Sequence, residues 1–327
     1  MHKKLIELLP GFRGKKIIVW GDLILDEYIY TTTSRISREA PVLVTEFESN
    51  EYILGGAGNV VMNVKMLGAV PIPVAFIGTG SDGKTLKKIL GQNSITTDFL
   101  LELDEYRTPK KSRILSGGEN TKKQQVLRID TLNKAEIGKA AYGKIEATIR
   151  DLLKNIDYLI MSDYLYKSVI PDVFSRIRQR FPSRNFIIDS RDHLMEFKDV
   201  TIATPNEPEI KKLFPVRNFF SEEEFYEAGE ELRNRLNAGG IVLKRGHKGM
   251  MVFEKDSPAQ KIDIHGSSQI VDVTGAGDTV ISVVSLALSA GADLVSAAQL
   301  ANIAAGIVVM KEGCYPIGLQ ELENELN

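Results

Sequence analysis

The chain has 327 residues, of which 43% are hydrophobic and 26% charged, as in a globular protein with one large α/β domain or two small ones. Its net charge of −2 argues against nucleic acid or an anionic membrane as the main partner. The single cysteine excludes an internal disulfide and favours a cytoplasmic location. We expect no signal peptide, no membrane span, which needs roughly 20 apolar residues, and no transition-metal site among the four scattered histidines.

Apolar β-rich runs alternate with helical patterns, which predicts a mainly parallel sheet covered by helices. The predicted strands of this sheet are Lys16–Trp20, Val74–Gly78, Tyr158–Ser162, Asn185–Asp189, Thr201–Thr204 and Ile241–Lys244. The predicted helices are Ala57–Leu67, Gly83–Leu90, Lys134–Lys154, Ile170–Phe181, Glu222–Asn237, Ala276–Ala290 and Leu294–Lys311.

Two extended segments, Tyr28–Leu54 and Ser112–Asp130, lack a crossover helix directly after them. We expect them to form a small separate sheet that acts as a lid, with an antiparallel edge extension of the main sheet as the alternative. The chain has no internal repeat or linker. Residues 1–327 are therefore predicted to be one domain with a lid at about 28–54 and 112–130.

Two polar motifs lie near the first predicted strand. Gly21–Asp26 (GDLILD) ends that strand and would place Asp26 at the carboxyl edge of the sheet, where α/β proteins bind ligands. Gly55–Asn59 (GGAGN) would let a polyol approach the backbone, with Asn59 offering a donor and an acceptor to its hydroxyls. A solvated turn at Asp26 and a glycine-rich hinge at 55–59 are the structural alternatives.

Gly78–Thr85 (GTGSDGKT) matches the phosphate-loop pattern between a predicted strand and a predicted helix. It also contains G-x-G-x-x-G, with Asp98 and Glu102 near the distance expected of a ribose-binding acid. One loop cannot serve both purposes, and neither motif normally lies beyond the first βα unit. We favour a third interpretation, a glycine-rich βα turn in which Asp82 caps the next helix.

Basic residues gather in the two lid segments. Lys110, Lys111, Arg113 and Arg128 lie in or beside the second segment, and Arg35 lies in the first. Together they could hold a phosphate that is already on the substrate. A solvated charged face is the alternative, but apolar strand residues flank both Arg113 and Arg128.

Two motifs follow later strands. Asn206–Glu209 (NEPE) begins a helix, and its amide and carboxylate could hold the waters of a Mg²⁺ ion on nucleotide phosphates. Helix capping by Asn206 explains the same residues equally well. Lys244–Gly249 (KRGHKG) offers cations and flexible backbone to nucleotide phosphates, or else forms a basic surface turn.

Asp272–Thr279 (DVTGAGDT) is the most informative motif, with three small residues and then Asp278 at the start of an apolar helix. Free N–H groups at a helix N-terminus bind anions, and glycines let a phosphate approach closely. A carboxylate there could take a proton from a hydroxyl that attacks a phosphoryl group. An N-cap after a glycine-rich turn is the alternative.

Gly55–Asn59, Asn206–Glu209 and Asp272–Asp278, in this order, resemble the signatures of the ribokinase-like (PfkB) carbohydrate kinases. This resemblance covers nearly the whole chain and implies a three-layer α/β/α sandwich with a small β lid, the use of ATP and Mg²⁺, and a homodimer joined through the lid. It also implies that the Gly78–Gly83 turn is not the nucleotide loop.

Within the family, the chain is most similar to kinases that phosphorylate C1 of D-glycero-β-D-manno-heptose 7-phosphate, on the way to ADP-heptose for lipopolysaccharide. The segments that carry this closer match are Thr33–Val42, Lys111–Leu115, Gln124–Asp130, Ser162–Tyr164 and Ala304–Val309. The chain departs from those kinases at Arg38, where Pro is usual, and at Arg191, where Lys is usual. Many bacterial versions are fused to a nucleotidyltransferase.

The resemblance and the motifs together assign a role to each candidate residue. The predicted base is Asp278, with an anion hole at the amides of Gly275, Ala276 and Gly277. The predicted substrate-binding residues are Asp26, Gly55, Gly56, Asn59, Arg35, Lys111, Arg113, Arg128, Asp163 and Arg191. The predicted nucleotide-binding residues are Asn206, Glu209, Lys244, Gly246, Gly249 and Asn302. Asn206 and Glu209 are expected near Mg²⁺ through water, and a monovalent cation such as K⁺ is expected at the carbonyls of Asp272 and Thr274.

Three other functions remain open at this point. The chain could be another ribokinase-like kinase, acting on ribose, fructose or a fructose phosphate. It could be a nicotinamide-dependent oxidoreductase that uses Gly78–Gly83. It could also be a catalytically silent sugar-binding regulator with the kinase fold, although the intact Asp278 and Asn206–Glu209 speak against this.

Overall fold

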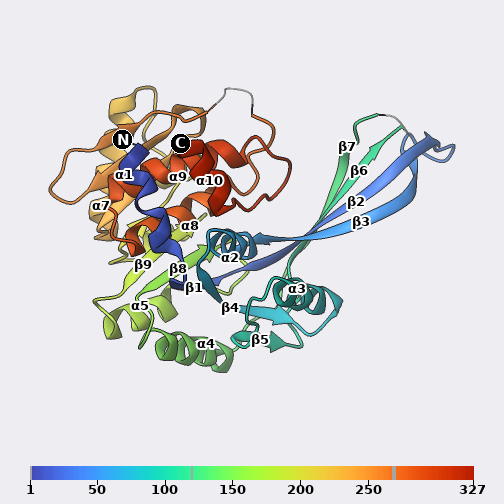
Figure 1. The fold of residues 1–327 in the computed structure, drawn as a ribbon. Coiled ribbons are helices and arrows are strands. Elements are labelled where there is room, and N and C mark those ends of the chain that lie inside the picture. The colour runs from blue at the N-terminus through green and yellow to red at the C-terminus, as the bar shows by residue number, and fades with distance from the viewer. Residues whose placement is uncertain (1, 119–120, 267–269) are drawn as a thin grey trace.

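The computed structural model describes residues 2–118, 121–266 and 270–327, whose strands form two sheets (Figure 1). The larger sheet has nine strands in the order β13-β12-β11-β10-β9-β8-β1-β4-β5. These are β1 Lys16–Gly21, β4 Val70–Gly78, β5 Leu100–Leu103, β8 Tyr158–Asp163, β9 Asn185–Ser190, β10 Ile202–Ala203, β11 Gly240–Lys244, β12 Met250–Glu254 and β13 Gln260–Ile262. The smaller sheet has the order β3-β2-β6-β7, with β2 Leu23–Ile36, β3 Leu43–Gly56, β6 Lys110–Gly117 and β7 Gln124–Thr131.

Helices pack on both faces of the nine-stranded sheet, which confirms the predicted α/β/α sandwich. One face carries α1 His2–Ile6, α2 Ala57–Met66, α3 Ser81–Gln92, α8 Ala276–Ser289, α9 Leu294–Val308 and α10 Leu319–Leu326. The other face carries α4 Lys139–Leu152, α5 Pro171–Arg180, α6 Glu207–Leu213 and α7 Glu222–Leu236. Short 3-10 turns lie at η1 Leu9–Phe12, η2 Leu194–Glu196 and η3 Gly246–Lys248.

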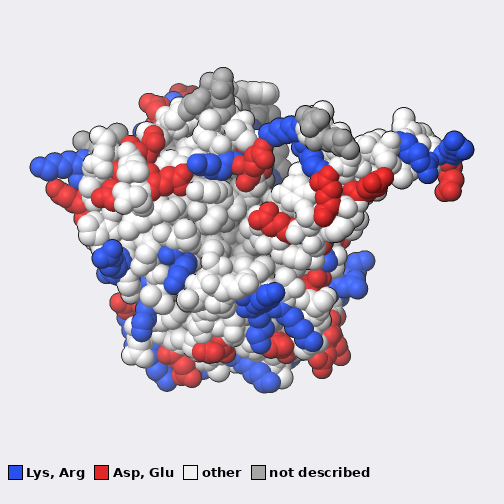
Figure 2. Space-filling view, turned by 45° about the vertical axis from the view of Figure 1, so that its right-hand side comes forward, with Lys and Arg blue, Asp and Glu red and all other residues white. Residues whose placement is uncertain are grey.

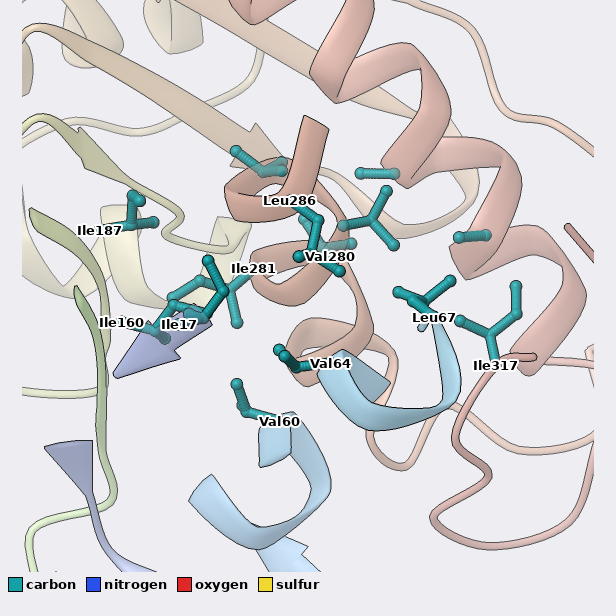
Figure 3. Close-up of a cluster of buried hydrophobic side chains, with 14 of the residues drawn as sticks. Ile17, Val60, Val64, Leu67, Ile160, Ile187, Val280, Ile281, Leu286 and Ile317 are labelled. Carbon is teal, nitrogen blue, oxygen red and sulfur yellow. The ribbon is translucent and has the colours of Figure 1, made fainter. Parts of the chain in front are cut away.

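The central strands are buried on both faces, so their apolar residues run without interruption. Successive side chains point to opposite faces: Ile17 of β1 belongs to the core beneath α2 and α8, and Ile18 to the core beneath α4 and α5. Figure 3 shows the first core, in which Val64 of α2 and Ile281 of α8 lie near the strand residues. Burying a side chain of this size fully contributes roughly 1.5–3 kcal/mol to folding.

In the nine-stranded sheet, the seven neighbouring strands β11-β10-β9-β8-β1-β4-β5 are all parallel. The strands β12 and β13 continue this sheet beyond β11 as antiparallel strands. The sequence analysis did not predict β5, β12 or β13. The strand β12 follows β11 directly through a turn at Gly246 and Gly249, both of which have a positive φ. The helix predicted from Lys134 begins only at Lys139, because Gly138 is still extended.

Asp26 does not, as was predicted, end the first strand of the main sheet. The strand β1 ends at Gly21, and Asp26 lies within β2, because residues 23–36 pair with β3 and β6 instead of the main sheet. The strands β2 and β3 each run for 14 residues, and Figure 1 shows the four-stranded sheet extending away from the main body. Asp26 is at the root of this sheet, next to the ends of the main strands.

Charged residues of both signs are interspersed over the face drawn in Figure 2, in keeping with the small net charge. Across the three described ranges, each helix is too short or too polar to cross a bilayer.

Candidate active site

A polar cavity of about 350 Å³ lies where the root of the four-stranded sheet meets the carboxyl ends of the main strands. Strands β8, β9 and β11 end at this cavity with Asp163, Ser190 and Lys244. The predicted residues that line it are Asp26, Gly56, Lys111, Arg113, Arg128, Asp163, Arg191, Asn206, Glu209, Lys244, Thr274, Gly275, Gly277 and Asp278. Tyr164, Asp189, Ser190, Val273 and Cys314 also line it and were not predicted.

Asp278 lies buried in the first turn of α8 and faces this cavity. Its Oδ2 accepts a hydrogen bond from Asn59 Nδ2 at 3.0 Å, and its Oδ1 accepts one from the Tyr164 hydroxyl at 2.8 Å. Burial raises the pKa of Asp278 to about 6, although these two donors and the nearby Lys244 favour its charged form. The carboxylate is therefore held firmly and has a basicity suited to accepting a proton near neutral pH.

The turn before α8 requires its glycines. Gly275 has a φ of 81°, and a Cβ there would lie 2.5 Å from Asn59 Nδ2. A Cβ on Gly277 would lie 3.2 Å from Lys244 Nζ. The amide of Ala276 already donates to the carbonyl of Val273 at 3.3 Å. The Ala276 amide could therefore donate to a bound anion at this helix start only if its hydrogen bond to Val273 were broken.

Asp26 is enclosed by groups that fix both of its oxygens. Arg113 Nη1 donates to its Oδ1 at 2.6 Å, and Cys314 Sγ approaches its Oδ2 at 3.4 Å. A Cβ on Gly55 would lie 2.2 Å from Oδ2. Gly55 does not line the cavity, so its predicted contact with substrate is wrong. The absence of a side chain at Gly55 instead leaves room for the Asp26 carboxylate.

Further cations surround the cavity next to Asp26. Lys111 Nζ lies 5.6 Å and the guanidinium of Arg191 lies 4.7 Å from the centre of the Tyr164 ring. Burial lowers the pKa of Lys111. Arg128 lines the cavity while its Nε donates to Asp130 at 2.8 Å. This side of the cavity suits an anionic ligand.

Two residues that were predicted to bind substrate, Asp163 and Arg35, differ from the cations next to Asp26 in their contacts or in their position. Asp163 is buried, and its oxygens accept hydrogen bonds from Ser190 Oγ at 2.7 Å and from the Leu165 amide at 2.9 Å. It therefore stabilises the ends of β8 and β9. Arg35 lies toward the outer end of β2, opposite Val44, and does not line the cavity. Nine residues of extended strand beyond Asp26 correspond to roughly 30 Å, so this chain does not bring Arg35 to its own site.

Asn206 and Glu209 form a capping box at the start of α6. Asn206 Oδ1 accepts from the Glu209 amide at 2.9 Å, and Glu209 Oε2 accepts from the Asn206 amide at 2.8 Å. Both residues nevertheless line the cavity. Burial and the nearby Asp189 raise the pKa of Glu209. A cation bound here would offset that unfavourable negative charge, so the donor set fits Mg²⁺ held through water.

A second, more apolar cavity of about 430 Å³ adjoins the first and shares Asn206, Lys244, Val273 and Gly277 with it. The predicted residues Gly246, Gly249, Ala276 and Asn302 line it, together with apolar residues that include Ile264, Ile270, Val280, Ala305 and Val309. Asn302 Nδ2 donates to the carbonyl of Asp263 at 2.8 Å and so holds one wall. Lys244 Nζ lies 2.7 Å from Asp189 Oδ2 at the junction of the cavities.

Asp272 ties the turn before α8 to the C-terminal segment. Its Oδ1 accepts from the amide and the hydroxyl of Thr274 at 2.9 and 2.7 Å, and its Oδ2 accepts from the Gly313 amide at 3.0 Å. These contacts order the carbonyls at which a monovalent cation was expected, and that cation stays a prediction.

The phosphate-loop match at Gly78–Thr85 has a packing explanation. A Cβ on Gly83 would lie 1.9 Å from the carbonyl oxygen of Gly78, so glycine is required where α3 crosses the end of β4. The predicted cap by Asp82 is wrong, because α3 begins after Gly80 and Asp82 Oδ1 instead accepts from Lys110 Nζ at 3.1 Å. Lys84 lines neither of the two cavities described above.

The sequence analysis missed Tyr164, Asp189 and Cys314 as site residues. A signal for Asp189 existed, because it ends a buried strand, but several strands of this chain end in Asp and made it inconspicuous. Tyr164 occurs in a quoted segment without a role. Cys314 lies 288 positions from the Asp26 that it contacts, and no pattern in the sequence links the two.

Comparison with known proteins shows the family to which this chain belongs. A family model described as pfkB family carbohydrate kinase matches residues 15–321. Bifunctional protein HldE of Histophilus somni is 36% identical over 97% of this chain and 64% of that protein. Bifunctional protein HldE of Nitratiruptor sp. is 33% identical over 94% of this chain and 64% of that protein. The chain thus spans about 64% of the length of these relatives.

Solved structures share the fold at low sequence identity. Phosphofructokinase-2 from Escherichia coli in complex with potassium has a TM-score of 0.76 and 16% identity, over 96% of this chain and 98% of that chain. Arabidopsis thaliana ribokinase complexed with ribose and ATP has a TM-score of 0.72 and 17% identity, over 96% and 99%. With a fold of this kind and a family match over nearly its whole length, the chain belongs to the pfkB family of carbohydrate kinases.

Proposed function

We propose that this chain is an ATP-dependent sugar-phosphate kinase that phosphorylates C1 of D-glycero-β-D-manno-heptose 7-phosphate to the 1,7-bisphosphate. The observation that carries the proposal is the position of Asp278, at the cavity that adjoins the apolar one through Gly277 and Lys244. The polar cavity suits a sugar phosphate, and the apolar cavity suits the base and ribose of a nucleotide. The closer resemblance of the lid segments to heptose kinases supports this particular sugar.

In the proposed reaction, Asp278 accepts the proton of the C1 hydroxyl as that oxygen attacks the γ-phosphorus of ATP. The bond from the γ-phosphorus to the ADP oxygen breaks, and the proton on Asp278 later passes to solvent. Lys244 and the amides at the start of α8 would stabilise the negative charge of the transferred group. Asn206 and Glu209 would hold Mg²⁺ through water, and the ion would supply charge neutralisation at the phosphates.

The sugar phosphate would be held on the other side of Asp278. Asp26, with both oxygens fixed, would accept hydrogen bonds from sugar hydroxyls. Lys111, Arg113 and Arg128, together with Arg191 where Lys is usual, would bind the 7-phosphate. Closure of the four-stranded sheet over the site would exclude water and suppress hydrolysis of ATP.

We further propose a homodimer joined through the four-stranded sheet. Large apolar side chains are exposed along it, including Ile36, Leu43, Phe47, Leu127 and Ile129. Their burial against a second copy would remove an apolar surface that is unusual for a monomer. Arg35 lies on the same sheet and could reach a site only in the partner. K⁺ at the carbonyls of Asp272 and Thr274, and a cytoplasmic location, stay predictions.

The alternatives differ in their support. Membership of a carbohydrate kinase family and the packing role of Gly78–Gly83 leave no support for an oxidoreductase that would use this turn. Another sugar kinase, acting on ribose, fructose or a fructose phosphate, would use the same Asp278. A silent sugar-binding regulator would bind without turnover.

A panel of acceptors tests the proposal. ADP release would be measured with heptose 7-phosphate, ribose, fructose, fructose 6-phosphate and no sugar. We expect kcat/KM for heptose 7-phosphate to exceed kcat/KM for each other sugar by about 10² or more. A sugar that lacks a matching phosphate or hydroxyl would leave buried charged groups of the site unpaired, which weakens binding of the transition state. Highest activity on another sugar would favour an alternative kinase, and no ADP release above the blank would favour the regulator.

A further inference from the structure

The loop Tyr164–Ser168, which follows β8, has an unusual backbone. Leu165 and Lys167 both have a positive φ, of 69° and 74°, although neither is glycine. Such a conformation costs of order 1–3 kcal/mol per residue and persists only where surrounding contacts determine it. Contacts to the amides and to the carbonyls of this loop therefore hold it in its backbone conformation.

Asp22 fixes the amides of the loop. This buried carboxylate accepts from the amides of Tyr164 and Tyr166 through Oδ2, at 2.8 and 3.0 Å, and from the amide of Ser168 through Oδ1, at 2.9 Å. Asp22 directly follows β1, so the centre of the main sheet determines the path of the loop.

Three aromatic side chains fix the carbonyls of the loop. The Tyr106 hydroxyl donates to the carbonyl of Tyr166 at 3.1 Å, and the Tyr142 hydroxyl donates to that of Lys167 at 3.1 Å. Trp20 Nε1 donates to the carbonyl of Ser168 at 2.8 Å. Side chains from β1, α4 and the segment before β6 thus hold one short loop rigidly.

Tyr164, the first residue of this loop, lines the polar cavity of the site. Its hydroxyl donates to Asp278 Oδ1 at 2.8 Å, and the cations of Lys111 and Arg191 lie over its ring. Burial raises the pKa of Tyr164 well above its usual value, so the hydroxyl stays protonated and acts as the donor. Asn59 holds only the other oxygen of Asp278.

We propose that Tyr164 is a positioning residue for phosphoryl transfer, which fixes the Asp278 carboxylate through its hydroxyl and holds Arg191 and Lys111 against its ring. This inference rests on the proposed role of Asp278 as base. With donors on both oxygens, the carboxylate cannot rotate, and its remaining lone pairs keep one direction. One ring thereby sets the spacing between the base and two cations that would bind the sugar phosphate.

A pH readout follows from the charges around Asp278. The groups that face it are the phenol of Tyr164, Asp189 from β9, Lys244 from β11 and the thiol of Cys314. A hydrogen bond to the charged form lowers a pKa, so loss of the Tyr164 hydroxyl should raise the pKa of Asp278 further. The acidic limb of the activity profile should then move to higher pH.

The experiment compares Tyr164→Phe with two other tyrosine variants. Tyr106→Phe removes a contact to the loop without touching Asp278, and Tyr158→Phe removes a hydroxyl that donates to Leu288, away from the site. The titration midpoint of Asp278 would be followed by ¹³C NMR of labelled aspartate carboxyls, assigned with Asp278→Asn. The pH profile of kcat/KM would be followed with heptose 7-phosphate.

We expect Tyr164→Phe to raise the midpoint and the acidic limb together by about one pH unit, and to lower kcat about tenfold or more at neutral pH. Neither shift should occur in Tyr158→Phe, and Tyr106→Phe, which removes one contact of the loop but keeps the Tyr164 hydroxyl, should shift both by less than Tyr164→Phe does. An unchanged midpoint in Tyr164→Phe, or an equal shift in Tyr158→Phe, would overturn the inference. The NMR titration needs no turnover, so a wild-type chain that phosphorylates no sugar would refute the proposed function while the Tyr164–Asp278 link is still tested.

Discussion

Asn59 Nδ2 lies 3.0 Å from Asp278 Oδ2, a contact that joins two motifs 219 positions apart in the sequence. Asn59 is in the first turns of α2, and Asp278 is in the first turn of α8. The two helix starts thus meet at one carboxylate, and the glycine at position 275 is needed for their close approach. A residue expected on sugar hydroxyls is, in this structure, a direct partner of the proposed base.

The pH dependence of the wild-type enzyme follows from the environment of Asp278. Burial raises its pKa to about 6, so the carboxylate is charged above that pH and protonated below it. A protonated carboxyl cannot accept the hydroxyl proton. We therefore expect kcat/KM to fall about tenfold per pH unit as the pH drops below about 6. A profile that stays level from neutral pH to about 5 would contradict this role for Asp278.

Arg113→Ala should weaken binding of the sugar phosphate. Arg113 contacts Asp26 and faces the polar cavity, so the variant loses a charged contact and leaves Asp26 without its partner. We expect KM for the sugar phosphate to rise about 10- to 100-fold, with little change in KM for ATP. Arg176→Ala on the surface of α5 is the matched control and should leave both constants unchanged. An equal loss of ATP binding in Arg113→Ala would argue against the assignment.

Lys84→Ala should have almost no effect on turnover. Lys84 lines neither of the two cavities of the site, although it occupies the lysine position of a phosphate-loop pattern. We expect kcat and KM for ATP within about twofold of wild type, since surface substitutions change little. Steady-state kinetics would check this. A severe loss of ATP turnover would instead mean that the loop binds phosphate.

Gly277→Ala should lower activity with little loss of fold stability. The added methyl would lie 3.2 Å from Lys244 Nζ, so Lys244 must shift by a few tenths of an ångström at the junction of the cavities. A misplacement of about 1 Å can cost on the order of 10² in rate, so this smaller shift should lower kcat/KM by about two- to tenfold. Thermal unfolding and kcat/KM would be measured together, with Gly143→Ala as a control, because that glycine of α4 has open space around it. Full activity in Gly277→Ala would show that the site tolerates a side chain there.

Much of the fold could be predicted because the buried strands and the helix periods are both strongly marked. Two of the strands that the sequence analysis missed, β5 and β13, are short edge strands with few buried residues to signal them. The strand β12 was missed although four of its five residues are buried. The course of residues 22–26 was also mispredicted, since GDLILD reads as the end of one strand. Only the pairing of β2 with β3 and β6 shows that a second sheet begins there.

The site could be predicted where the residues that act together lie within one short motif. The motif around Asp278 and the capping pair Asn206 and Glu209 could be read from local spacing. Contacts between distant segments could not, because spacing along the chain does not encode them. Cys314 beside Asp26 and Tyr164 beside Asp278 are contacts of this kind, and they became visible only in three dimensions.

The central claim is that Asp278 is the base, and Asp278→Asn tests it most directly. The amide keeps the shape of the side chain but cannot accept the hydroxyl proton. Turnover of heptose 7-phosphate would be measured at saturating substrates, with ATP binding and thermal unfolding followed in parallel. We predict a loss of about 10²–10⁴ in kcat with little change in ATP affinity. A kcat close to that of the wild-type enzyme would contradict the account.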